Sequence, residues 1–125
     1  MDRHIQSRLK REQVIWFVTA GRDLKPQAVP VWFYWDGRSF LIYATAGRKV
    51  RDVRENANVE LHLNSDEAGD DIVRASGQAT TTRLGRPSPG FTRKYRSAIN
   101  DLGLTVENFF RDYGHPIRVT RLKFR

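Results

Sequence analysis

The most chemically suggestive feature of the sequence is an apolar, aromatic stretch followed closely by a basic one. Residues 30–35 read Pro-Val-Trp-Phe-Tyr-Trp, and residues 47–49 open a segment with helical periodicity. A helix N-terminus offers unpaired backbone N–H groups and the positive end of the dipole, so this start is a candidate phosphate site. Lys49 supplies a point charge there, and Arg51 or Arg54 a guanidinium that can bind a phosphate in bidentate fashion. A flat ring lying against the aromatic stretch would sit beside that phosphate.

Other catalytic chemistries lack the residues they need. Without cysteine there are no disulfides, thiol nucleophiles or thiolate metal sites. The histidines His4, His62 and His115 have no metal-ligand spacing, so no metal site is expected. Neither a Walker loop nor a Gly-x-Gly-x-x-Gly turn occurs. The adjacent carboxylates Asp70 and Asp71 lie in an expected turn and face apart. No catalytic residue is therefore assigned from the sequence.

Length and charge narrow the class of protein. The chain has 125 residues and a formal net charge of +8, which predicts one domain over residues 1–125 with an anionic partner. That partner is a nucleic acid, a membrane surface or a phosphorylated small molecule. The longest apolar run, residues 28–35, falls far short of the ~20 needed to cross a bilayer. The start also lacks a signal peptide, so a soluble cytoplasmic protein without membrane contact is expected.

Hydrophobic periodicity predicts a mainly β, α+β domain. Helical spacing is expected over residues 2–12, 47–57, from 91 onward, and after a cap at Thr105. Asp36-Gly37 is a two-residue hairpin signal, and residues 83–90 read as a loop. Strands are expected over residues 14–19, 27–35, 39–45, 59–63, 72–82 and 115–125, the last with a bulge or bend. Six strands with hairpin signals and short helices favour an antiparallel barrel with helices closing its ends.

Several of these segments together resemble the pyridoxamine 5′-phosphate oxidase-like family, and more closely its branch that uses coenzyme F420. The resemblance covers nearly the whole chain. It is carried by residues 14–19 (VIWFVT), 26–37 (PQAVPVWFYWDG), 40–43 (FLIY), 49–56 (KVRDVREN), 59–64 (VELHLN), 102–110 (LGLTVENFF) and 115–120 (HPIRVT).

The resemblance implies a six-stranded split β-barrel that forms a homodimer, with flavin-type sites across the interface. Three groups of residues would contact the cofactor: backbone groups around Pro30, Val31, Trp32 and Phe33 at the ring's pyrimidine edge, Tyr43, Ala44 and Thr45 beside the ribityl chain, and Arg48, Lys49, Arg51 and Arg54 at the phosphate. F420 also carries a lactyl group and a glutamate tail, and its extended negative charge suits the basic composition.

Two departures from the family pattern concern the phosphate site. The chain has Asp52 and Ala57 where the family commonly has Asn and Pro, and the segment between Tyr43 and Lys49 is about one residue short. A carboxylate at Asp52 would repel a phosphate unless it turns away to pair with Arg48 or Arg51.

The expected function is an F420H2-dependent reductase that transfers hydride to an unsaturated or quinone-like acceptor. Tyr43 or solvent would supply a proton. The same fold with FMN is one alternative, and a protein that binds cofactor or haem without turnover is another. A basic small barrel that stacks single-stranded nucleic acid is an alternative of a different class, although its aromatic residues lie within apolar runs rather than between Lys and Arg.

Overall fold

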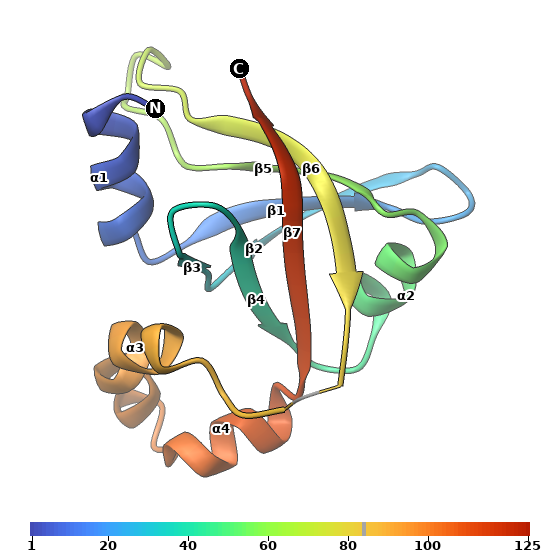
Figure 1. Cartoon of the computed structure of the whole chain (residues 1–125), viewed down its shortest axis with the longest axis vertical. Coiled ribbons are helices and arrows are strands. Elements are labelled where there is room, and N and C mark those ends of the chain that lie inside the picture. Colours follow the sequence, from blue (N-terminus) through green and yellow to red (C-terminus); the bar gives the residue numbers. More distant parts are fainter. Residues whose placement is uncertain (84) are drawn as a thin grey trace.

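A strongly curved antiparallel sheet forms the body of the protein, with four helices around it (Figure 1). The computed structural model describes residues 1–83 and 85–125. Position 84, inside the expected loop, lies outside the described residues. The strands are β1 (Ile15–Ala20), β2 (Pro26–Val31), β3 (Tyr34–Trp35), β4 (Phe40–Ala44), β5 (Asn58–His62), β6 (Arg74–Thr81) and β7 (His115–Phe124). The helices are α1 (Arg3–Arg11), α2 (Arg48–Glu55), α3 (Pro89–Asp101) and α4 (Val106–Asp112).

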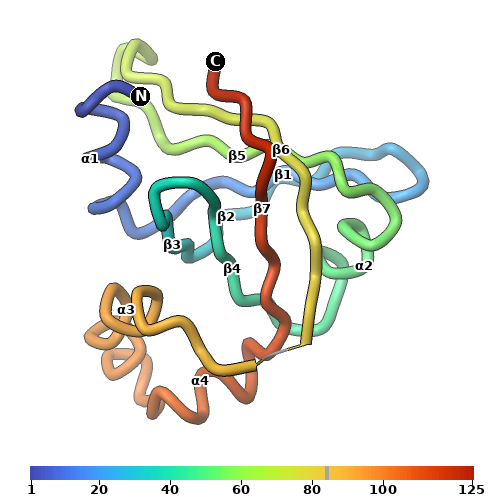
Figure 2. Tube along the Cα trace, viewed as in Figure 1, coloured from blue at the N-terminus to red at the C-terminus, as the bar shows by residue number. Residues whose placement is uncertain are grey.

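The sheet is so strongly curled that its two edge strands are connected by a short segment of the chain. Its strand order is β2-β1-β5-β6-β7-β4-β3, with every pair antiparallel. The end strands β2 and β3 are consecutive in sequence, linked by Trp32 and Phe33. The result is a curled half-barrel in which α3 and α4 lie together at one end, while both termini lie at the other (Figure 2). Among the described residues, no helix has the length and apolar character needed to span a bilayer.

The number of strands corrects the sequence-based prediction of six. The expected strand over residues 27–35 is interrupted at Trp32 and Phe33, so it appears as β2 and β3 and the sheet has seven strands. The physical reason is that both backbone groups of Phe33 bond to side chains of α3 instead of a neighbouring strand: its N–H donates to the Tyr95 hydroxyl (2.9 Å) and its oxygen accepts from Lys94 Nζ (3.0 Å).

Smaller boundary differences follow from capping and turn geometry. The hairpin between β3 and β4 is present, but it spans residues 36–39, closed by the Asp36 N–H to Ser39 oxygen bond. Gly37 takes a positive φ of 96° there. Ser88 caps α3, so Pro89 and Gly90, expected in a loop, form the first turn of the helix.

Successive side chains of β4 point to opposite faces of the sheet and contribute to two separate hydrophobic cores. Every residue of β4 is buried, because its two faces are covered by different layers. Ile42 faces the barrel core with Phe17 and Leu61, whereas Leu41 and Tyr43 face α3 and α4. The second core consists of Leu41, Tyr43, Phe91, Tyr95, Ile99, Phe109 and Phe110, with Trp32 and Tyr34 packed against it.

The expected irregularity in the last strand is confirmed as a β-bulge. The register between β6 and β7 shifts between Ser76 and Gln78, and Arg121 on β7 has a φ of 52°. Gly77 lies opposite this bulge. A Cβ there would come within 2.8 Å of side-chain atoms of Leu122, so the close approach of the two strands needs glycine.

Candidate functional site

A cavity of about 410 Å³ lies where β2, β4, α2 and α4 meet. Several of its lining residues are ones that the sequence analysis assigned to a cofactor. They come from β2 and the residue after it, from the end of β4, and from α2. The described lining residues are Pro30, Val31, Trp32, Tyr43, Ala44, Thr45, Lys49, Leu102, Phe109 and Tyr113. The volume lies within the range of roughly 300–1,000 Å³ that is usual for small-molecule sites.

One wall of the cavity is a continuous stack of aromatic rings. Trp32 lies parallel to Tyr95, with centroids 4.6 Å apart and planes within 5°. Trp32 also stacks on Phe109 at 5.5 Å, and Phe109 stacks on Tyr113 at 4.6 Å. Tyr113 is half-buried at the outer end of this stack. The cavity therefore has an aromatic wall whose rings are held in fixed orientations, which suits a planar conjugated ligand.

Two side chains of α3 hold the backbone next to this stack. The Tyr95 hydroxyl accepts from Phe33 N–H and lies 2.7 Å from the Gln13 oxygen and 3.0 Å from the Phe33 oxygen. Burial raises the pKa of the Tyr95 hydroxyl above its usual range, so this tyrosine remains protonated. Lys94 Nζ adds a second bond to the Phe33 oxygen. The position of Trp32 is thus set by a helix some sixty residues later in the chain.

The basic side of the cavity is the first turn of α2. Lys49, in this turn, lines the cavity. The N-cap residue is Gly47, which has no side chain that could accept a hydrogen bond from the first N–H groups of the helix. A lysine that lines the cavity from the first turn of a helix is a suitable partner for a phosphate group.

The structure resolves the question raised by the carboxylate in this helix. Asp52 is only 3% exposed, and its Oδ2 accepts from the Thr19 hydroxyl (3.1 Å) and from Arg48 Nε (3.4 Å). Asp52 therefore faces the sheet rather than the cavity and pairs with Arg48, as one of the two expected arrangements requires. Its charge is partly balanced by that guanidinium.

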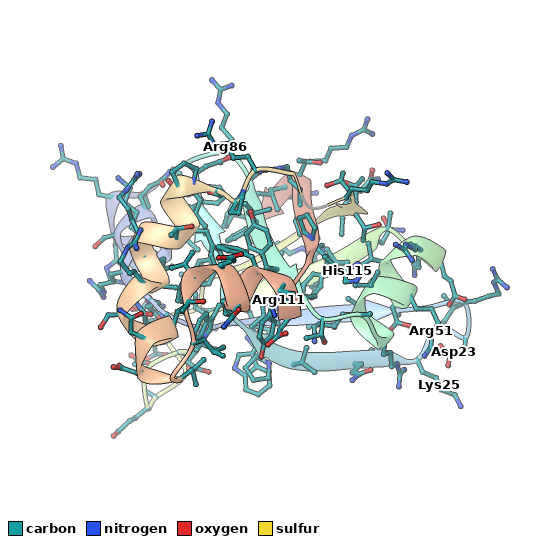
Figure 3. The ribbon with its side chains drawn as sticks, turned by 90° about the horizontal axis from the view of Figure 1, so that it is seen from below. Asp23, Lys25, Arg51, Arg86, Arg111 and His115 are labelled. Atoms are coloured by element: carbon teal, nitrogen blue, oxygen red, sulfur yellow. The ribbon has the colours of Figure 1, made fainter. Side chains whose placement is uncertain are left out.

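Four of the residues expected at the cofactor do not line the cavity. Arg48 is engaged with Asp52, and Arg54 Nε points toward Thr81 on β6 at 3.4 Å. Arg51 is exposed, and in Figure 3 it extends toward the β1–β2 turn that carries Asp23 and Lys25. Phe33 is fully buried in the barrel core, with its backbone groups bonded to α3.

Tyr43 lines the cavity with its ring but directs its hydroxyl elsewhere. That oxygen accepts from the Ser88 N–H at 3.0 Å, at the start of α3. The ring packs edge-on against Phe91 and Phe110. Tyr43 thus anchors α3 to the sheet, and its hydroxyl lies beside Ser88, which is not among the described lining residues of the cavity.

Three lining residues were missed by the sequence analysis. Leu102 follows α3, and Phe109 and Tyr113 belong to α4 and its C-cap. Phe109 entered the sequence analysis only within the helix expected after Thr105 and within the family resemblance over residues 102–110. The available signal was the density of aromatic residues over positions 109–113, which exceeds what one short helix needs for its own packing.

Two other features were considered for a ligand site. An open hollow of about 510 Å³ lies on the outer face of β1, β5, β6 and β7, but its described lining has no aromatic side chain and mixes Glu60 with Arg121 and Lys123. Within residues 1–83 and 85–125, no group of three His, Asp or Glu side chains is placed to hold a metal ion. The aromatic and basic cavity is therefore the candidate site.

Comparison with protein families agrees with this arrangement. The family model described as pyridoxamine 5′-phosphate oxidase matches residues 1–123. The chain belongs to the pyridoxamine 5′-phosphate oxidase family. Membership accounts for the curled antiparallel sheet and confirms the resemblance of the sequence. No curated protein matches this chain.

Solved structures similar to this family member differ in what they bind. An F420 reductase has a TM-score of 0.71 at 20% identity, covering 100% of this chain and 98% of its own. HutZ, the haem storage protein of Vibrio cholerae, has a TM-score of 0.62 at 13% identity, covering 94% and 87%. A FAD-binding protein of Mesorhizobium loti has a TM-score of 0.59 at 12% identity, covering 97% and 89%. At these identities the likeness establishes the shared fold alone.

Proposed function

We propose that the protein is an F420H2-dependent reductase that transfers hydride to an unsaturated or quinone-like small molecule. The observation that carries the proposal is the cavity that joins Trp32, Thr45 and Lys49 from three separate elements. Membership of an oxidoreductase family and the likeness to an F420 reductase support it.

The lining chemistry fits a deazaflavin with a phosphate-bearing chain. The aromatic wall formed by Trp32, Phe109 and Tyr113 would bound the flat ring, and Lys49 in the first turn of α2 would hold the phosphate. The basic composition favours the acidic tail. When bound, reduced F420 supplies the hydride.

The chain's own role in this reaction is orientation and exclusion of water. Tyr95 and Lys94 fix the backbone at Phe33, and through it the position of Trp32. A rigid cavity wall restricts the angle between ring and acceptor, which lowers the entropic cost of reaching the reactive geometry. Because the Tyr43 hydroxyl lies beside Ser88, which does not line the cavity, we assign the proton that follows the hydride to solvent.

The same proposal includes a cytoplasmic homodimer with the cofactor sites at its interface. Its support is the outer face of β2, where Ala28 and Pro30 are exposed and Pro30 also lines the cavity. A second copy packed there would complete the wall of the site. Light scattering coupled to gel filtration tests the dimer, and a monomer at micromolar concentration would contradict it.

The deciding experiment is titration of cofactor-free protein with oxidised F420 and, separately, FMN, followed by tryptophan fluorescence. Trp32 lies in the cavity wall, while Trp16 and Trp35 do not line it. Binding should therefore quench the wild type strongly and a Trp32→Phe variant weakly. The matched pair Lys49→Gln and Arg51→Gln removes one charge each, and only the first should weaken binding by about tenfold.

Each alternative function predicts a different outcome of this titration. Preference for FMN would assign the protein to the FMN-dependent oxidoreductases. The likeness to a FAD-binding protein supports this flavin-dependent alternative. Binding of haem alone would favour storage, as in HutZ. Failure of all three, with salt-sensitive binding of single-stranded oligonucleotides, would favour the nucleic-acid reading.

A further inference from the structure

A second cavity lies between α1, β3 and α3, and it shares no lining residue with the first. Its volume is about 380 Å³. Its described lining residues are Lys10, Tyr34, Trp35, Arg93 and Lys94. Three of these side chains are cationic, two are aromatic and none is acidic, so the cavity favours an anion with a flat apolar body.

Lys94 occupies an unusual position for a lysine in this cavity. Its Nζ donates to the Phe33 oxygen at 3.0 Å and lies 3.8 Å from the centroid of the Phe33 ring. The Tyr95 ring is 5.3 Å away. In the described part of the chain no carboxylate forms an ion pair with it, and the nearby acid Glu12 is bonded to Arg8. One carbonyl and two ring faces replace the water that an exposed ammonium would have.

The surroundings of Lys94 favour the neutral amine. Desolvation lowers the pKa of Lys94 to about 8, and the charge of Glu12 opposes that shift. Lys10 and Arg93 line the same cavity, where both side chains are exposed. At pH 7 about a tenth of a group with this pKa is uncharged, against less than a thousandth for an exposed lysine. While one N–H donates to the Phe33 oxygen, the lone pair of the neutral amine remains available to a reactant.

We propose that this cavity captures small aromatic aldehydes bearing a carboxylate or phosphate, by reversible formation of an imine with the Lys94 amine. Lys10 and Arg93 hold the anionic group, and the ring lies against Tyr34 and the edge of Trp35. The Lys94 nitrogen adds to the aldehyde carbon, a C=N bond forms, and the carbonyl oxygen leaves as water with two protons from the amine. The reaction needs no oxidant or reductant. A proton taken up from solvent then converts the imine to the iminium ion, whose single N–H donates to the Phe33 oxygen.

The first test compares all lysines within one protein. The wild type is incubated at pH 7.5 with limiting 4-formylbenzoate, imines are trapped with cyanoborohydride, and adducts are quantified by peptide mass spectrometry. Lys94 should carry at least about tenfold more adduct than any of the other lysines, Lys10, Lys25, Lys49 and Lys123. Equal labelling, or a different lysine as the main site, would overturn the proposal.

The second test separates recognition of the anion from reactivity of the amine. Neutral 4-methylbenzaldehyde has the ring and the aldehyde but no carboxylate, so its labelling of Lys94 should be about fivefold lower. Arg93→Gln should lower labelling by 4-formylbenzoate and leave that by the neutral aldehyde unchanged. Equal labelling by both aldehydes in the wild type would show that the cavity does not select anions, and would overturn that part of the proposal.

A third comparison distinguishes loss of the reactive amine from loss of the folded structure. Lys94→Gln keeps an N–H donor for the Phe33 oxygen, so it should lose the main adduct while its circular dichroism and melting transition remain those of a folded protein. Arg93→Gln, which changes a residue that does not line the first cavity, should still bind the ligand of that cavity. The imine proposal does not depend on the proposed reductase function. The two fail separately, because one is measured at Lys94 and the other by quenching of Trp32.

Discussion

The hydroxyl of Tyr95 offers a sharp test of how the cavity wall is held. Tyr95 is fully buried, and its oxygen contacts Phe33 N–H, Phe33 O and Gln13 O within 3.0 Å. In Tyr95→Phe the ring remains, but the buried Phe33 N–H loses its acceptor and the Gln13 oxygen its donor. The Phe33 oxygen keeps its bond from Lys94. The variant therefore isolates the cost of two unpaired backbone groups.

That cost can be estimated from the burial of each group. An unsatisfied buried polar group costs about 1–3 kcal/mol, and the Gln13 oxygen is only partly buried, so the sum is about 2–4 kcal/mol. For a domain of this length the entropy of unfolding corresponds to about 4 °C per kcal/mol. The melting temperature should therefore fall by about 8–16 °C, and cofactor affinity should fall with it, since Trp32 stacks directly on Tyr95.

Calorimetry of Tyr95→Phe beside Tyr113→Phe makes the test specific. Tyr113 belongs to the same aromatic stack but is half-buried, and no side-chain hydrogen bond of its hydroxyl is found in the described part of the chain. Its variant should remain within about 1 °C of the wild type. A loss below about 1 kcal/mol for Tyr95→Phe, or equal losses for both variants, would refute the idea that this hydroxyl holds the break between β2 and β3.

Three further predictions concern charge, packing and pH. Lys49→Gln should weaken binding of a phosphate-bearing cofactor by about tenfold in the fluorescence titration, while Arg54→Gln, whose side chain points away, should change it less than twofold. Gly77→Ala should cost about 1–3 kcal/mol in urea denaturation, because its Cβ would overlap neighbouring atoms at 2.8 Å, whereas Gly85→Ala, with open space around it, should cost under ~0.5 kcal/mol. Burial lowers the pKa of Lys94 from 10.5 to about 8, so between these pH values the unfolded chain binds more protons than the folded protein. The free energy of unfolding should therefore rise with pH across that window, by about 1–2 kcal/mol after discounting for partial exposure. In Lys94→Met this rise should be absent.

The parts of the fold that the sequence predicts are those set by local periodicity. Alternation predicts β5, the 3.6-residue stripe predicts α2, and a short cap signal at Thr105 predicts α4. The bulge in β7 was also predictable, since Ile117 and Leu122 fall in opposite phases of one strand. In each case the deciding interactions join residues close in sequence or along one strand pair.

The interruption at Trp32 and Phe33 could not be predicted in this way. Residues 27–35 have the composition of one continuous strand, and nothing local distinguishes the break. It exists because Lys94 and Tyr95, on a helix distant in sequence, supply the bonds that a strand partner would otherwise supply. The density of aromatic residues over positions 109–113 could indicate a role for them, but it does not place Phe109 and Tyr113 at the candidate site, because the position of α4 depends on packing in the second core.

The charge pattern of α2 shows how a residue that looks unfavourable in sequence can fit the candidate site. Read as a string, Asp52 sets a negative charge beside Arg48, Lys49 and Arg51 and weakens the case for an anion site. In the structure the helix turns this carboxylate toward Thr19, where it bonds the hydroxyl and also engages Arg48. Lys49 is left at the cavity. One face of this eight-residue helix is buried and another carries Lys49 at the cavity. The electrostatic potential of the site therefore depends on which charged side chains lie on the cavity face, and not on the net charge of the segment.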